Sequence, residues 1–267
     1  GIYYLVGDFT PEKRVENALF FCDRKHPELI KNHNSIIFVK NPQLVFYLLL
    51  QEFYPIRSTG KIHPTAIVDE AAVIDQSAEI GPYCVIGKSR IGQGAVLKSH
   101  VVIYDKSEIG ESVIIEPNTV IGATGVAWIW NDKTNKRIVQ PQIGGVKVED
   151  DVFVGSNVTV VRGSLNENTK IGQGSMIAHG SKIGHGCCLG ANVHLANNVS
   201  LAGNVDIGDR SFLGSGAVVR PRTQLPSDTT VGAGAVVVKS VTESNQILVG
   251  VPAKAIPNTG RRLQGVP

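Results

Sequence analysis

The chain has 267 residues, of which 42% are hydrophobic but only 6% aromatic, and a formal net charge of +3 at pH 7. This length allows one large domain or two unequal ones, and so small a net charge gives no reason to expect a nucleic-acid partner. Four cysteines without a CxxC spacing argue against structural zinc, and without a signal peptide or an apolar run long enough to insert into a membrane we expect a reduced, cytoplasmic protein.

Residues 1–58 lack any repeat and predict a small α/β domain. β-Branched and aromatic residues cluster in three short runs, as in strands, and two Pro residues stand where helices begin. The expected elements are strands at 2–6, 18–21 and 35–39, a short helix at 27–31, and a helix from Asn41-Pro42 to about Tyr54. Residues 55–60 are the expected linker.

From residue 61 to 256 an aliphatic side chain falls on nearly every sixth position. The series runs Ile62, Val68, Ile74, Ile80, Ile86; Ile91, Leu97, Ile103, Ile109, Ile115, Ile121; Val148, Val154, Val160; then Leu165 and every sixth residue to Val237. A six-residue period fits neither a helix nor a simple strand alternation. It is typical of an all-β parallel β-helix, here of about nine coils. Three hexads to a coil place residues eighteen apart above one another.

Residues 124–146 interrupt this series and contain both tryptophans, Trp128 and Trp130. We interpret the segment as a loop extruded from one corner, because insertions in solenoids map to loops that often line a binding face. The two indoles could stack on a base or a sugar, or pack against a neighbouring subunit. Residues 257–267 follow the repeats as a C-terminal tail.

His179 is the candidate catalytic residue, because it lies two positions after the inward Ile177 and points outward at a corner. An imidazole there could serve as a general base, and the alternative is a solvated corner histidine. The eighteen-residue rule puts Asn197 one coil above it and Val161 one coil below. His185 has Glu167 eighteen residues below it, and we interpret these two as a structural pair.

The repeats resemble those of the left-handed β-helix acyltransferases over nearly the whole chain. Similarity to UDP-3-O-(3-hydroxyacyl)glucosamine N-acyltransferases of lipid A synthesis is carried by residues 41–46, 62–66, 120–123, 141–146, 162–165 and Ile177-Ala178-His179. Similarity to sialic-acid and bacillosamine-type sugar acetyltransferases is carried by residues 193–196, 201–205, 231–237 and 250–254. In the first family an Asn follows the catalytic His, whereas Gly180 stands here, so Asn197 is the candidate partner of His179.

The resemblance implies a left-handed β-helix and a homotrimeric N-acyltransferase that acts on a nucleotide-linked amino sugar for cell-surface polysaccharide or lipopolysaccharide synthesis. Acetyl-CoA is the expected acyl donor, with an acyl carrier protein thioester as the alternative. The N-terminal domain would help to bind the nucleotide sugar, and the last coils would bind the donor. The candidate substrate-binding residues are Phe21, Trp128, Trp130 and Arg162, and the candidate cofactor-binding residues are Gly203, Gly214, Ala233, Lys239 and Lys254.

Three other functions stay open. The first is acyl-carrier-protein-dependent acylation in lipid A synthesis. The second is a zinc enzyme like the γ-class carbonic anhydrases, which share hexapeptide repeats; it needs three converging imidazoles, and no third histidine stacks on His179 or His185. The third is a scaffold without catalysis. Because no third histidine is available, we expect no metal.

Overall fold

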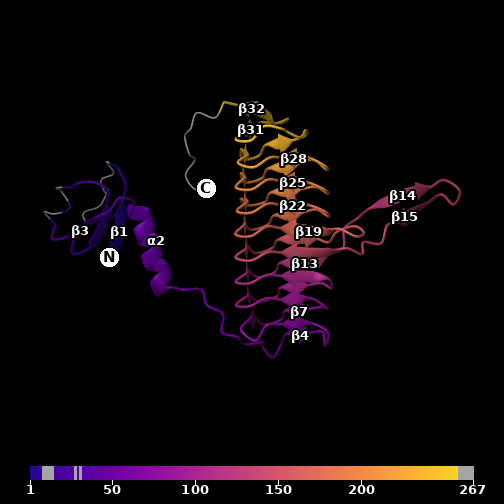
Figure 1. Cartoon of the computed structure of the whole chain (residues 1–267), viewed down its shortest axis with the longest axis horizontal. Helices are drawn as coiled ribbons and strands as arrows, with labels where there is room; N and C mark the ends of the chain where they lie inside the picture. Colours follow the sequence, from indigo (N-terminus) through magenta and orange to yellow (C-terminus); the bar gives the residue numbers. More distant parts are fainter. Residues whose placement is uncertain (8–14, 27–28, 30–31, 258–267) are drawn as a thin grey trace. The chain divides into compact units, whose positions relative to one another are not determined.

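The computed structural model describes residues 1–7, 15–26, 29 and 32–257. These form two compact units, Gly1–Arg57 and Ser58–Pro267 (Figure 1). The short helix predicted at 27–31 and almost all of the predicted tail lie outside the described residues. Within the described ranges, no helix has the length and apolar character needed to cross a bilayer.

The described residues of the first unit include a three-stranded parallel sheet and a helix that packs on it. Its strands are β1 (Ile2–Leu5), β2 (Leu19–Cys22) and β3 (Ser35–Phe38), and the helix is α2 (Pro42–Phe53). The side chain of Asn41 caps α2 by accepting a hydrogen bond from the N–H of Leu44 at 3.0 Å. Phe46 of α2 packs on Tyr4 with their ring centroids 5.2 Å apart, which holds the helix against the sheet.

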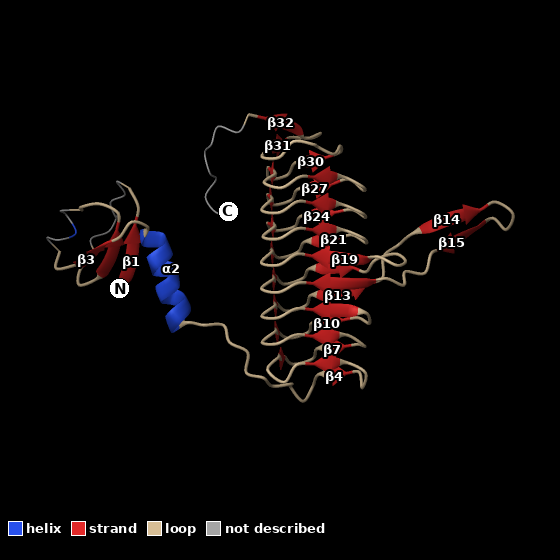
Figure 2. Cartoon of the chain, viewed as in Figure 1, coloured by secondary structure: helices blue, strands red, loops and turns tan. Residues whose placement is uncertain are grey.

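The second unit is a parallel β-helix whose coils contribute strands in turn to three sheets, here named I, II and III (Figure 2). Sheet I has nine strands: β4 (Ile67–Val68), β7 (Val85–Ile86), β10 (Val102–Ile103), β13 (Val120–Ala123), β18 (Thr159–Val161), β21 (Lys182–Ile183), β24 (Ser200–Leu201), β27 (Val218–Val219) and β30 (Val236–Val237).

Sheet II has eight strands: β5 (Val73–Ile74), β8 (Arg90–Ile91), β11 (Ser107–Ile109), β16 (Gly145–Val148), β19 (Asn168–Ile171), β22 (Cys188–Leu189), β25 (Asp206–Ile207) and β28 (Gln224–Leu225). Sheet III has ten: β6 (Glu79–Ile80), β9 (Val96–Leu97), β12 (Ile114–Ile115), β17 (Phe153–Val154), β20 (Met176–Ile177), β23 (His194–Leu195), β26 (Phe212–Leu213), β29 (Thr230–Val231), β31 (Ile247–Val249) and β32 (Lys254–Ile256).

The repeating aliphatic residues fill the interior of this solenoid. Leu195, for example, pairs with Ile177 in the coil below and Leu213 in the coil above, and all three are fully buried. One coil cannot bury its own inward side chains, so the coils must stack to make a common core. The predicted parallel β-helix is confirmed.

Asparagine is common at the second position of the corner turns, where the backbone is left-handed. Asn118, Asn157, Asn198 and Asn204 have φ of 62°, 59°, 59° and 58°. Asn adopts this conformation more readily than most non-glycine residues, because its short side chain can hydrogen-bond locally. The corner turns can therefore change direction with asparagine in place of glycine and without an extra residue.

Two predicted inward positions are exposed: Ile62, at the start of the first coil, and Leu165. Leu165 is 49% exposed, because residues 162–167 bulge out between β18 and β19 and the interior series continues at Ile171. The coil from β17 to β20 therefore holds five more residues than the coil from β20 to β23. As a result Ser156, not Val161, lies one coil below His179, and its N–H donates a hydrogen bond to that imidazole.

The predicted loop at 124–146 contains an antiparallel hairpin, β14 (Trp128–Asn131) and β15 (Lys136–Val139), that projects from the coil stack (Figure 1). The side chain of Asn131 accepts hydrogen bonds from the N–H groups of Lys133 and Thr134, which closes the turn. Aromatic and β-branched residues on either side of this polar tip favour strands, so the segment pairs with itself.

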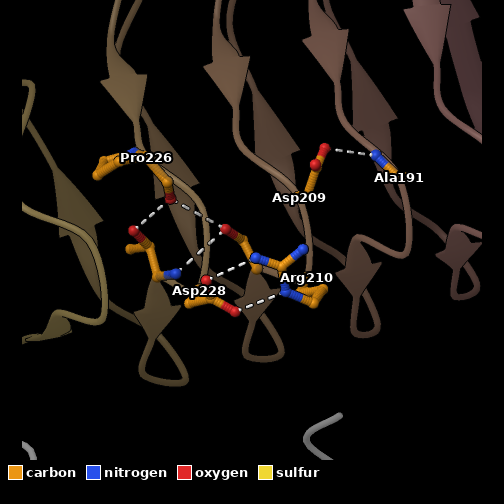
Figure 3. A network of polar contacts seen from close by, with 7 residues as sticks. Ala191, Asp209, Arg210, Pro226 and Asp228 are labelled. Atoms are coloured by element: carbon orange, nitrogen blue, oxygen red, sulfur yellow. Dashed lines mark hydrogen bonds and ion pairs between the residues drawn. The ribbon is translucent and has the colours of Figure 1, made fainter.

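Polar side chains link successive coils at the corner between sheets II and III (Figure 3). The guanidinium of Arg210 donates two hydrogen bonds of 2.8 Å to the carboxylate of Asp228 in the next coil, and Asp209 accepts one from the N–H of Ala191 in the coil before. The hydrogen bonds from Arg210 and its positive charge lower the pKa of the Asp228 carboxyl. This corner is a structural seam, and no predicted site residue lies on it.

Candidate functional site

The predicted site residues lie on two different corners of the solenoid. The I–II corner, defined by the segments that lead from sheet I to sheet II, carries the Trp hairpin, Arg162 and Gly203; Lys239 follows β30, the last strand of sheet I, in a segment that leads to β31 of sheet III. The III–I corner, defined by the turns that lead from sheet III to sheet I, carries His179, Asn197, Gly214 and Ala233. Lys254 lies on β32, and Phe21 is a buried residue of β2 in the first unit, with 6% of its surface exposed.

His179 is exposed on the III–I corner, but one of its ring nitrogens is already engaged. The N–H of Ser156 donates a hydrogen bond of 2.8 Å to Nδ1. In a neutral imidazole the other nitrogen, Nε2, must then carry the proton. That form has no free lone pair with which to take a proton from a substrate. Asn197 is exposed in the turn above, and among the described residues no hydrogen bond joins its side chain to His179.

His185 is half-buried on the I–II corner, and its Nδ1 meets a different kind of partner. Its Nδ1 lies 3.0 Å from the hydroxyl Oγ of Ser164. A hydroxyl accepts a hydrogen bond as well as it donates one, so Nδ1 can keep its proton and leave the lone pair on Nε2 free. The ring lies over Gly203 of the next coil, where a Cβ would come within 2.6 Å of Cε1.

The loop 162–167 brings Ser164 to His185. Glu167 closes the loop, because its carboxylate accepts hydrogen bonds from the N–H groups of Ser164 at 2.6 Å and Leu165 at 3.1 Å. Partial burial acts to raise the pKa of Glu167, but these N–H groups and the nearby charge of His185 outweigh it and lower the pKa. The carboxylate therefore stays ionised beside the histidine. The predicted pairing of His185 with Glu167 is an electrostatic one, with Ser164 making the closer contact.

Arg162 lies at the start of the same loop and reaches down the corner. Its Nε donates to the carbonyl of Gly122 at 2.9 Å and its Nη2 to that of Asp105 at 3.3 Å, and the guanidinium lies 5.8 Å from the ring centroid of Tyr104. The base of the hairpin sits directly against the loop, since Ile143 N–H donates to the carbonyl of Ser164. Arg162, the hairpin base and His185 thus share one corner.

The outer coils of the I–II corner are basic. Arg220 and Arg222 follow Gly203 one coil on, and Lys239 follows one coil further; all three are exposed. Cationic side chains in such a column suit phosphate groups. Both tryptophans of the hairpin are 48% exposed, and the guanidinium of Arg137 lies 4.7 Å from the ring of Trp128.

Two kinds of chemistry find no support in the described part of the chain. Cys187 lies two residues after His185, and burial raises the pKa of its thiol to about 12. A thiol so rarely ionised at neutral pH is a poor nucleophile. Across the described ranges, no three or more His, Cys, Asp or Glu side chains gather in a way that could hold a metal ion.

From the sequence, His185 was interpreted as a structural partner of Glu167, and its contact with Ser164 was not predicted. The signal that could have found it lies in the interval between Val160 and Ile171, which holds a loop in place of one strand. Such a loop on a solenoid corner is a place where functional side chains collect. It contributes both Arg162 and Ser164.

Known sequence families match the repeats. The family described as bacterial transferase hexapeptide (six repeats) matches residues 88–123, 164–197 and 189–221. The hexapeptide repeat of succinyl-transferase matches residues 145–180.

Individual proteins are also similar. UDP-3-O-acylglucosamine N-acyltransferase of Coxiella burnetii is 35% identical over 161 residues, which are 53% of this chain and 46% of that protein. The enzyme of the same name from Pseudomonas syringae is 32% identical over 158 residues, covering 52% and 44%. The chain spans about half the length of the curated relatives it matches. A solved structure, the UDP-N-acetylglucosamine O-acyltransferase of Moraxella catarrhalis, aligns over 73% of both chains at 32% identity with a TM-score of 0.67.

Proposed function

Since this chain belongs to the family of bacterial transferases built from hexapeptide repeats, we propose that it is an N-acyltransferase that moves an acyl group from a thioester to the amine of a nucleotide-linked amino sugar. Relatives named as N-acyltransferases and O-acyltransferases of UDP-linked glucosamines support the reaction class. The product would serve cell-surface polysaccharide or lipopolysaccharide synthesis.

The observation that carries the proposal is the arrangement of His185, with Nδ1 against the Ser164 hydroxyl and Nε2 beside Gly203 without a hydrogen bond from the described residues. The amine nitrogen of the sugar attacks the thioester carbonyl, a C–N bond forms, and the C–S bond breaks. Nε2 takes the proton that the amine loses, and the resulting imidazolium returns a proton to the departing thiolate. We assign the base to His185 in place of His179, because the hydrogen bond from Ser156 occupies Nδ1 of His179.

The surroundings of His185 suit the two substrates. Arg162 and the Trp hairpin, which lie on the coils below, would bind the nucleotide sugar, the indoles by stacking on the base. Arg220, Arg222 and Lys239, which lie on the coils above, would bind phosphates of the donor, and acetyl-CoA is our first choice. Gly214, Ala233 and Lys254 stay predicted donor contacts that would need a neighbouring subunit, and Phe21 stays a predicted contact of the first unit.

We also propose that the protein is a cytoplasmic homotrimer. Outward side chains along sheet III support an assembly, because Phe153 and Met176 are neighbours on it, Phe212 follows beyond His194, and Met176 is 50% exposed. Three copies could pack about a threefold axis through such faces.

The test is a transfer assay with the full chain. Acetyl-CoA and a 3-hydroxyacyl thioester of acyl carrier protein would each be offered with UDP-linked sugars that differ in the position of a free amine. We expect mass spectrometry to show one acyl group gained on one amine, with acetyl-CoA as the better donor. Preference for the carrier-protein thioester would select lipid A acylation instead. Transfer to a hydroxyl, detected as a base-labile ester, or no transfer with any pair would refute the proposal.

A Gly203→Ala substitution tests whether the position of the His185 imidazole matters for transfer. The backbone of Gly203 is outside the left-handed region, so alanine is compatible with its conformation, but the new Cβ would overlap the ring of His185. We expect kcat/KM to fall by about a hundredfold, since a displacement on the order of 1 Å is enough for that, while the melting temperature changes little. In a His185→Gln background the same substitution should cause almost no further loss. An equal loss in both backgrounds would mean that the substitution does not act through His185.

A further inference from the structure

The loop 162–167 places the hydroxyl of Ser164 at Nδ1 of His185 and the side chain of Glu167 beside the adjacent Gly186. The loop consists of the extra residues between β18 and β19, and it lies on the corner directly beneath His185. The I–II corner has simple turns in the coils above, and only this one carries both a hydroxyl and a carboxylate next to an imidazole among the described residues.

We infer that Ser164 and Glu167 are positioning residues for His185: Ser164 fixes the tautomer with the proton on Nδ1, and the Glu167 carboxylate stabilises the imidazolium that forms during transfer. The inference deepens the proposed function and rests on it for the catalytic part only. Neither residue touches the reacting atoms, so both act through the histidine.

The tautomer argument follows from the contact of 3.0 Å between Nδ1 and Oγ of Ser164. If Nδ1–H donates to this oxygen, Nε2 keeps its lone pair, as a general base requires. His179 provides the contrast within the same chain, because a backbone N–H, which can only donate, meets its Nδ1. The partner of Nδ1 thus separates a histidine suited to accept a proton from one that is not.

The charge argument concerns Glu167. Its two carboxylate oxygens are held by the N–H groups of Ser164 and Leu165, so the negative charge has a fixed place near the ring. A carboxylate in such a place favours the charged form of the imidazole, which is populated only as the proton is transferred. The other nearby charge is Arg162, which is directed to the carbonyls of Gly122 and Asp105. The turn above offers Gly203 and Asn204, neither of which titrates.

The alternative is that Glu167 only caps the loop. Glu149 is a matched control, because it also accepts a backbone hydrogen bond, from Gln173 at 3.2 Å, but lies on the II–III corner. In Glu167→Gln the amide oxygen can still accept a backbone hydrogen bond, so the loop should keep its shape while the charge is lost. The variants to compare are therefore Ser164→Ala, Glu167→Gln and Glu149→Gln, each in the full chain.

The first measurement needs no substrate. Nitrogen NMR of the protein labelled in histidine reports which ring nitrogen carries the proton, and a His185→Gln sample identifies the signal. At a pH where imidazole is neutral, we expect the Nδ1–H form to dominate in the wild type, in Glu167→Gln and in Glu149→Gln. In Ser164→Ala its share should fall clearly. An unchanged tautomer in Ser164→Ala, or a dominant Nε2–H form in the wild type, would overturn the inference whether or not the protein is an acyltransferase.

The second measurement is kinetic. Ser164→Ala and Glu167→Gln should each lower kcat about tenfold with little change in KM, since both act on the proton transfer and not on binding. Glu149→Gln should match the wild type. A rise in KM with unchanged kcat in Glu167→Gln would reduce Glu167 to a structural cap. If no variant of His185 affects transfer, the proposed base is wrong, while the NMR result still decides whether Ser164 sets the tautomer.

Discussion

Replacement of His185 by Gln is expected to lower kcat/KM for acyl transfer by about a thousandfold, within the range of general-base catalysis. Glutamine retains a polar group of similar length but cannot accept a proton at neutral pH. The loss should appear mainly in kcat, because the imidazole is needed for the proton transfer and not for holding either substrate. Steady-state rates with saturating donor and varied acceptor would measure it.

His179→Gln is the matched control for this variant. His179 is also a corner histidine, two residues after a buried isoleucine, but the N–H of Ser156 donates to its Nδ1. We expect its kcat/KM to stay within about threefold of the wild type, as for a residue outside the chemical step. The reverse result, a large loss for His179→Gln and a small one for His185→Gln, would restore the assignment made from the sequence and move the site to the III–I corner.

The second large effect is on stability. Leu195→Ala should reduce the free energy of unfolding by about 2–5 kcal/mol, because it removes buried methyl groups from a close-packed core and leaves a cavity. Leu195 is fully buried between Ile177 and Leu213, and inward aliphatic residues of neighbouring coils surround it. Urea unfolding followed by circular dichroism would measure the change as a lower midpoint.

Leu165→Ala is the control, since the same substitution is made at another leucine of the hexad series. Leu165 is 49% exposed in the loop 162–167, so its truncation should change the free energy of unfolding by no more than about 0.5 kcal/mol. Equal destabilisation by the two variants would mean that Leu165 is an inward residue. The loop beneath His185, and with it the contact to Ser164, would then be wrong.

The pattern of aliphatic residues was sufficient to predict the solenoid, because every coil solves the same packing problem with the same residue types. It failed at Leu165 for a reason that the pattern itself cannot reveal. Leu165 lies six residues before Ile171 and so keeps the rhythm. The series skips one residue at Ile91 and again at Leu165. The first skip reflects a coil that is one residue shorter, in which Arg90 pairs with Val73, whereas the second coincides with an inserted loop.

The site was harder to predict than the fold. Arg162, the tryptophans and a corner histidine were predicted to be site residues. Because the five extra residues at 162–167 were not foreseen, the eighteen-residue rule predicted the wrong neighbour below His179. Ser156 replaces Val161 beneath that ring, and its N–H changes the chemistry of the imidazole. A backbone hydrogen bond of this kind depends on which turn lies underneath, so no residue type in the sequence predicts it.

The sequence by itself determined the parallel β-helix and the interruption at 124–146, because side-chain periodicity is a local property that successive residues express directly. Only the tertiary structure decided which corner each polar residue occupies and which group meets Nδ1 of His179 and of His185. Stacking register adds up every insertion along the chain, so five extra residues in one coil change the partners of side chains in the coils on either side.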